Sequence, residues 1–269
     1  MQSVWTSLSG MQASQAWLQT IGNNIANQNT TGYAENTASF ADTYTQLLQG
    51  SATGPTVASR VTPLGWSGGT GTFLQGVQSN FNGMSTTQTG NPTDIAIQGN
   101  GFFMVEGPNG KPLYTKAGDF TWSKAANGTM VLATAQGQPV LDVNGKPIVQ
   151  QAGVFSVSPD GQVSFGQGAA KTAAQQIAIA EVGMPSQTLV PVGNSLYQLA
   201  SGGAAAVVNR NTSPVGITVV QGSLNTSNVD LTKEMTNMIQ AQVLYQLNAQ
   251  AESFNNKMMQ SANALGTGL

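Results

Sequence analysis

The sequence predicts an α+β protein whose N- and C-terminal helices pair as a coiled-coil-like core layer, with an extended arm and a central antiparallel β-rich domain. Both ends carry apolar residues at steps of three and four, which is the period of a helix. The middle alternates short β-type runs with Asn-Gly and Asp-Gly turns. At 269 residues the chain is long enough for a large core, and we expect four segments, residues 1–30, 31–90, 91–222 and 223–269.

The first segment, 1–30, is predicted to be an assembly helix of about 25 residues. Positions 4, 8, 11, 15, 18, 22 and 25 step alternately by four and three residues, and five of these seven are apolar, so they form a heptad-like seam that Ile21 flanks. Gly10 and Gly22 each cost about 1 kcal/mol relative to alanine in a helix, so we do not expect this helix to be stable alone. The seam consists of Val4, Leu8, Met11, Leu18, Ile21 and Ile25.

The second segment, 31–90, is broken repeatedly by glycine and proline. Sixty residues of irregular chain are unusual in a compact monomer. We therefore expect an extended arm that becomes ordered by lying on a neighbouring molecule.

The third segment, 91–222, is predicted to be an antiparallel β domain of sandwich-like or barrel-like form. Its β-type runs include residues 94–98, 102–105, 129–132, 176–182 and 215–220. Glycine turns separate the runs at residues 99–101, 108–110, 127–128, 144–145 and 159–161.

The last segment, 223–269, is predicted to contain a second, longer assembly helix. No proline or glycine interrupts residues 229–265, which would span about 55 Å as a helix. Such a long helix with few charges presents a nearly neutral face that a monomer has little reason to keep, although packing of both helices on the chain's own core is the alternative. Its seam consists of Leu231, Met235, Ile239, Val243, Leu247, Phe254, Met258 and Leu265.

Composition excludes several classes of protein. Charged residues make up only 7% of the chain and the net charge is −2, which argues against a nucleic-acid partner and a polybasic membrane contact. The chain has no histidine and no cysteine, so we expect no metal site of the usual kind, no cofactor, no disulfide and no Ser-His-Asp triad. No run of 18 apolar residues predicts membrane insertion, and no secretory signal is recognisable at the N-terminus.

Candidate sites for chemistry are weak. The glycines at 68–71 lack the Lys-Ser/Thr of a phosphate-binding loop, and residues 142–146 lack the distal ligands of a calcium loop. Asp94, Glu106 and Asp119 are candidates for the acid and base of a secreted enzyme acting on cell-wall glycan, which is a second hypothesis. A phage-tail or surface-fibre protein is a third. We predict that the chain is not an enzyme.

Three separated motifs closely resemble bacterial flagellar rod and hook proteins. They read LSGMQA and LQTIGNNIANQNTTGY at residues 8–13 and 18–33, DIAIQGNGFF and YTKAGDF at 94–103 and 114–120, and GSLNTSNVDL at 222–231. The motif residues that we single out are Asn23, Asn24, Ala26, Asn27, Gly32, Ser227, Asn228 and Val229. Within the family, chain length, the arm and a single β domain are most similar to distal rod subunits, with a proximal rod or hook-type axial protein as the alternative.

The resemblance implies a structural subunit that polymerises with copies of itself and with other axial proteins of the rod and hook. It implies a helical tube in the flagellar basal body that transmits torque from the motor to the hook. It also implies export through the flagellar type III apparatus without a cleaved signal peptide. The seams at both ends are then expected to be subunit interfaces.

Overall fold

The computed structural model describes residues 2–43, 45–48, 66–69, 71–125, 128–166, 172–200, 205–208 and 216–266. The chain forms two compact units. The helical unit comprises residues 1–25, 36–78 and 231–269, and the β unit comprises residues 26–35 and 79–230. The fold is therefore α+β, as the sequence predicts.

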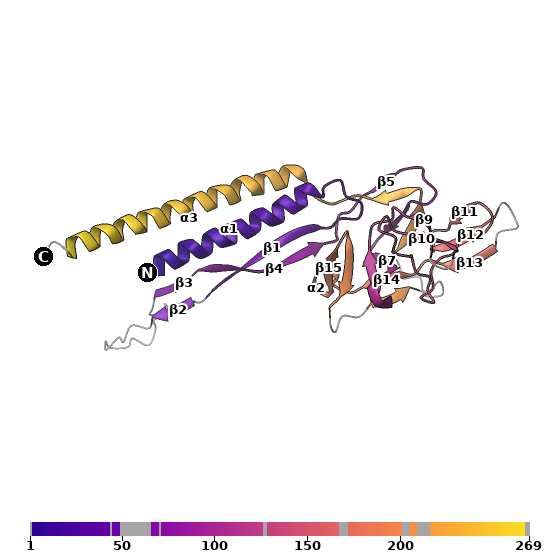
Figure 1. Ribbon diagram of the computed structural model, residues 1–269, viewed down its shortest axis with the longest axis horizontal. Coiled ribbons are helices and arrows are strands. Elements are labelled where there is room, and N and C mark those ends of the chain that lie inside the picture. The colour runs from indigo at the N-terminus through magenta and orange to yellow at the C-terminus, as the bar shows by residue number, and fades with distance from the viewer. Residues whose placement is uncertain are drawn as a thin grey trace, which may run out of the picture. The chain divides into compact units, whose positions relative to one another are not determined.

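Two long antiparallel helices and a β-ribbon make up the helical unit (Figure 1). The helices are α1 (Gln2–Ala26) and α3 (Leu231–Gly266). Glu234 lies in the first turn of α3, where the helix dipole favours a negative charge. The ribbon lies along α1 and consists of the pairs β1 (Glu35–Asp42) with β4 (Thr72–Asn80) and β2 (Thr45–Leu48) with β3 (Trp66–Gly69).

The two helices differ in length, and their ends are not level. Gly10 of α1 lies opposite Asn248 of α3, because a Cβ on Gly10 would be 2.8 Å from the Asn248 Nδ2. Both helices rise about 1.5 Å per residue, so the start of α1 lies near residue 256 of α3. The last turns of α3, about 15 Å of helix, extend beyond the start of α1 (Figure 1).

The largest sheet of the β unit has six antiparallel strands. In spatial order they are β15 (Leu189–Gly193), β16 (Leu196–Leu199), β8 (Pro112–Thr115), β7 (Gly101–Glu106), β14 (Ile179–Val182) and β17 (Ala205–Val208).

Smaller sheets complete the unit. They are β9 (Thr121–Lys124) with β10 (Met130–Ala133), β6 (Ile95–Gln98) with β18 (Thr218–Gln221), β5 (Thr86–Gln88) with β19 (Ser223–Asn225), and β11 (Phe155–Val157), β12 (Gln162–Phe165) and β13 (Thr172–Gln176). Two short helical turns are η1 (Pro108–Gly110) and α2 (Pro185–Thr188).

Two apolar clusters cover the two faces of the central strand β7. Phe102 packs edge-on against Phe81, with ring centroids 5.0 Å apart, in one cluster. Phe103 packs edge-on against Phe120, also at 5.0 Å, in the other. Successive strand residues point to opposite faces, so both faces of the sheet are buried at this strand. The β unit therefore has a closed core of its own.

Several of the predicted turns join paired strands. The turn at residues 108–110 connects β7 with β8, and the turn at 159–161 connects β11 with β12. The turn at residues 99–101 does not form a hairpin: β6 pairs with β18, and β7 pairs with β8 and β14, so this turn carries the chain from one sheet to another. Local turn chemistry specifies the change of direction but not the partner of each strand.

The segment for which the sequence predicts an arm, residues 31–90, contains strands β1 to β5 where it is described. Residues 44, 49–65 and 70 of this segment lie outside the described part of the chain. The first residue of the predicted β run 215–220, residue 127 of the predicted turn at 127–128 and the last three residues of the predicted C-terminal segment also lie outside it.

Candidate assembly surface

The face of α3 that is buried within the chain carries small and polar side chains. Glu234 and Ala241 are almost wholly buried, and Asn248, seven residues further on, is half-buried and lies against Gly10. A spacing of seven residues keeps these three positions on one side of the helix. At Gly10 the two helices approach closely because glycine leaves room for the Asn248 side chain.

The predicted apolar seam of α3 is exposed, and its middle lies on the side of the helix opposite the buried face. Ile239 and Val243 are two residues either side of Ala241, and at about 100° per residue they point roughly 160° away from it. Exposed fractions range from 37% for Leu231 to 76% for Leu265. We call the following exposed residues the α3 stripe: Leu231, Met235, Ile239, Val243, Leu247, Phe254, Met258 and Leu265.

The predicted seam of α1 is more covered. Ile21 is buried, whereas Val4, Leu8, Met11, Leu18 and Ile25 are half-buried. Trp5, which the heptad-like spacing did not include, is 67% exposed. The structure therefore does not bring the two predicted seams together along their whole length, since the buried face of α3 is a different one.

The β-ribbon packs closely on α1 through small residues. Gly71 lies so near the helix that a Cβ there would be 2.5 Å from the Ser9 Oγ. That hydroxyl accepts a hydrogen bond from the Thr72 backbone N–H at 3.3 Å. Further along the helix, Trp17 packs edge-on against Phe40, with ring centroids 6.3 Å apart. Sequence reasoning missed this contact because the ribbon is rich in glycine and weakly apolar.

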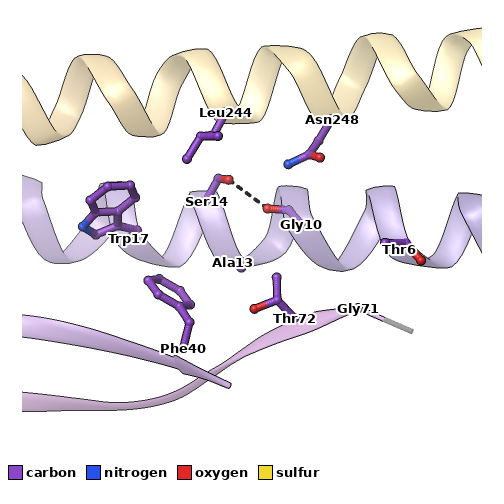
Figure 2. A pocket seen from close by; sticks show the side chains of 10 residues that line it. All are labelled: Thr6, Gly10, Ala13, Ser14, Trp17, Phe40, Gly71, Thr72, Leu244 and Asn248. Carbon is purple, nitrogen blue, oxygen red and sulfur yellow. Dashed lines mark hydrogen bonds between the residues drawn. The ribbon is translucent and has the colours of Figure 1, made fainter. Parts of the chain in front are cut away.

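A pocket of about 550 Å³ opens between α1, α3 and the ribbon (Figure 2). Trp17, Phe40 and Leu244 supply its apolar walls, and small residues of α1 supply its floor. It is lined by Thr6, Gly10, Ala13, Ser14, Trp17, Phe40, Gly71, Thr72, Leu244 and Asn248. None of these ten side chains carries a charge.

The side-chain amides of three motif asparagines form hydrogen bonds with backbone N–H and C=O groups. The Asn24 side chain donates to the Asn36 carbonyl and accepts from the Asn36 N–H, both at 2.9 Å. Asn225 does the same for Ile97, at 2.8 and 2.9 Å, and is 2% exposed. Asn228 accepts from the Glu35 N–H at 2.8 Å and donates to two carbonyls of the segment around residue 81. These side chains satisfy backbone groups where the regular ladder stops.

The other motif residues lie at the end of α1, in the turn that follows it, or just before α3. Gly32 has φ +64° and lies so close to Ala117 that no Cβ fits there. The Asn27 side chain accepts a hydrogen bond from the Thr30 hydroxyl, and the Ser227 hydroxyl accepts one from the Val229 N–H. Asn23 and Ala26 are exposed near the end of α1.

Lys116 is a buried cation that sequence reasoning did not single out. Its ammonium donates to the Gly99 carbonyl at 2.9 Å and lies 5.3 Å from the centroid of the Phe102 ring. Burial lowers the pKa of the Lys116 amine to about 8. Because it bonds to the Gly99 carbonyl, the amine anchors the turn that carries the chain from β6 to β7.

The carboxylates considered for acid–base chemistry are only partly brought together. Asp94 and Asp119 are backbone partners in an isolated bridge, whereas Glu106 lies at the other end of β7, opposite Pro112. Burial, with a contribution from the nearby Asp94, raises the pKa of Asp119. The Asp94 carboxylate accepts a hydrogen bond from the Thr89 hydroxyl at 2.6 Å, so it acts as a structural acceptor.

Within the described ranges, no group of three or more acidic side chains is arranged to hold a metal ion. No helix of the described part of the chain is long and apolar enough to cross a membrane.

Family models match the chain in three places. Residues 6–33 match the flagella basal body rod protein model, residues 96–165 the flagellar hook protein FlgE/F/G D1 domain, and residues 220–265 the flagellar basal body rod FlgEFG protein C-terminal model. These regions include most of α1, part of the β unit and nearly all of α3.

Curated relatives match over nearly the whole length. The flagellar basal-body rod protein FlgG of Bacillus subtilis is 35% identical, with 97% of each chain covered, and that of Agrobacterium fabrum is 34% identical, with 93% of each covered. The flagellar hook-basal body complex protein FlhP of Bacillus subtilis is 29% identical, over 98% of this chain and 99% of the relative. The chain therefore belongs to the flagellar basal-body rod protein family.

Proposed function

We propose that this chain is a structural subunit of the flagellar basal-body rod that polymerises with copies of itself into a helical tube and transmits torque from the motor to the hook. The observation that carries the proposal is the exposed α3 stripe in a chain related over nearly its full length to rod proteins. The seam residues of both helices are the proposed subunit contacts.

Burial of the stripe supplies the driving force. Each side chain that moves from half-exposed to buried contributes on the order of 1 kcal/mol, and eight such residues repeat at every subunit boundary. A head-to-tail contact whose rotation does not close generates a helical filament. In this proposal residues 1–30 and 223–269 are the assembly segments and 91–222 forms the outer domain. Residues 31–90 are an arm that adds contacts with neighbours to the packing of its β-ribbon on α1.

The family also suggests the partners and the place. We propose that the subunit reaches the basal body through the flagellar export apparatus without a cleaved signal peptide and contacts other rod and hook proteins there. Catalysis forms no part of this proposal. Within the family the distal rod is the preferred position, because FlgG relatives of 34–35% identity cover 93–97% of the chain, with a proximal rod or hook-type position as the alternative.

A matched pair of variants tests the proposal. Ile239→Asp removes apolar surface from the α3 stripe, whereas Gln240→Asp adds the same charge at the next, exposed position without removing any. We expect the purified Ile239→Asp protein to remain folded but to form no polymer in sedimentation and electron microscopy, and to be absent from isolated hook–basal bodies. Gln240→Asp should polymerise normally. Polymers of normal length from Ile239→Asp would contradict the proposal.

A further inference from the structure

The pocket between α1, α3 and the β-ribbon is an apolar hollow in the helical unit. The floor of the pocket is formed by small residues of α1, namely Gly10, Ala13 and Ser14. The larger side chains of Trp17 and Leu244 line its sides (Figure 2). The close approach of Gly71 to Ser9 holds the ribbon in place as the remaining wall. At about 550 Å³ the hollow is large enough for more than one apolar side chain.

We infer that this pocket is the receptor for the α3 stripe of a second copy of the chain. The inference rests on the proposed function, and it names the surface that receives the stripe. An open helical assembly needs two different, complementary surfaces on each subunit, because a contact made by the same patch on both copies closes into a dimer. Among the described residues of the helical unit, the stripe is an exposed apolar surface and the pocket is an apolar hollow.

A stripe cannot fill the pocket of its own chain. Ile239 and Val243 point roughly 160° away from the buried Ala241, whereas the pocket opens on the side where α3 meets α1. The two surfaces nevertheless adjoin each other, because Leu244 lines the pocket and is 45% exposed, between the stripe residues Val243 and Leu247. A copy that donates its stripe therefore presents its own pocket alongside.

The absence of charge on both surfaces supports this occupant. None of the ten pocket-lining residues and none of the eight stripe residues is ionisable. An uncharged apolar hollow imposes no desolvation cost on an apolar guest, but it would impose one on a charged segment. The stripe of another copy matches the chemistry of the pocket.

The first test fills the pocket by replacing two of its lining residues with larger side chains. Thr6 is an exposed residue at the pocket and Ser14 lies on the floor, so Thr6→Trp and Ser14→Met occupy the hollow without touching the stripe. Gln12→Trp and Gln12→Met place the same side chains at an exposed position of α1 outside the pocket. We expect Thr6→Trp and Ser14→Met to raise the protein concentration needed for polymerisation at least about tenfold, with unchanged helix content by circular dichroism. The Gln12 variants should behave as wild type.

The second test uses the absence of cysteine. Thr72→Cys places a thiol in the pocket, and Val243→Cys, Leu247→Cys or Phe254→Cys places one on the stripe. We expect a disulfide-linked dimer when a pocket variant and a stripe variant are mixed under assembly conditions. A dimer formed by Thr72→Cys alone would show a symmetric contact between two pockets and would overturn the inference.

A small apolar dye that binds the monomer's pocket supplies a third readout. Release of the dye on polymerisation supports the inference, and retention in the polymer overturns it. If Ile239→Asp blocks assembly while Thr6→Trp and Ser14→Met do not, the inference fails and the proposed function stands. If Ile239→Asp also assembles normally, the proposed function itself fails.

Discussion

The β unit and the helical unit place their large apolar side chains differently. Phe102, Phe103 and Phe120 in the β unit are at most 1% exposed, and they pack in edge-on pairs with other aromatic rings. In the helical unit the whole α3 stripe faces solvent, and α3 packs within the chain through Ala241 and other small or polar residues. The β unit buries its large aromatic rings within its own core, whereas the helical unit leaves a long apolar stripe exposed.

The difference shows that a regular apolar pattern does not reveal what covers it. The strands of the β unit and the stripe of α3 are both regular, and only the structure shows that the first pattern is satisfied within the chain. Substitutions in the two units should therefore separate stability from assembly.

The largest effect on stability is expected at Phe103. Phe103→Ala should lower the free energy of unfolding by about 3–5 kcal/mol, because the ring is fully buried against Phe120. The same change at Phe254, which is 63% exposed, should cost less than about 0.5 kcal/mol in the monomer but should weaken polymerisation. Urea unfolding followed by circular dichroism measures the first effect and sedimentation the second. Equal losses of monomer stability would remove the distinction between the units.

The next effect is expected at Asn225. Asn225→Ala leaves the buried N–H and C=O of Ile97 without their amide partners, at a cost of about 3 kcal/mol in urea unfolding. Asn91→Ala, at an exposed asparagine, is the control and should be neutral. Asn24→Ala removes an equivalent pair of bonds in the helical unit. A neutral Asn225→Ala variant would show that the amide bonds do not contribute to holding β6.

Lys116 should make the stability of the β unit depend on pH. Its folded-state pKa of about 8 is below the ordinary value of 10.5, so between these values the unfolded chain binds more protons than the folded one. Stability should therefore rise with pH, by about 2 kcal/mol between pH 7 and pH 10 relative to Lys116→Met. The exposed Lys111→Met is the control. Parallel pH profiles for the wild type and Lys116→Met would contradict this.

The pH range in that experiment ends at 10 because of two tyrosines. Burial raises the pKa of the Tyr114 phenol, and it raises that of Tyr197 to about 12. Above pH 10 the unfolded chain loses its phenolic protons first, so these groups lower the stability as the pH rises.

The smallest effects are expected at the two glycines of α1. Gly22→Ala meets nothing within 4 Å, so it should stabilise the helical unit by up to about 1 kcal/mol through helix propensity. Gly10→Ala gains the same propensity but places its Cβ 2.8 Å from the Asn248 amide, which must move, so the net change should be near zero or unfavourable. Thermal unfolding of the two variants compares them directly. An equal gain at both positions would show that α3 does not pack closely at Gly10.

Sequence reasoning predicted the parts that depend on local pattern. The long helices at both ends, the α+β class and the turns at residues 108–110 and 159–161 follow from apolar spacing and turn chemistry, and the structure confirms them. The family was also predicted, because its motifs are continuous in sequence.

The features that were not predicted depend on contacts between residues that are distant in the sequence. The ribbon of β1 and β4 was missed because its strands carry glycine and polar residues and are held by α1 through Ser9 and Trp17. The pocket was missed for the same reason, since its walls come from three separate elements. The role of Asn225 as a partner of Ile97 needs two positions 128 residues apart, which no local motif specifies.

The unequal lengths of α1 and α3 have a mechanical consequence. Because the end of α3 projects about 15 Å beyond the start of α1, its last turns have no α1 residues of the same chain beside them. A sideways force on the tip of α3 would bend these turns about the point where α1 begins. Support from a neighbouring subunit at this tip would stiffen the helix against such bending.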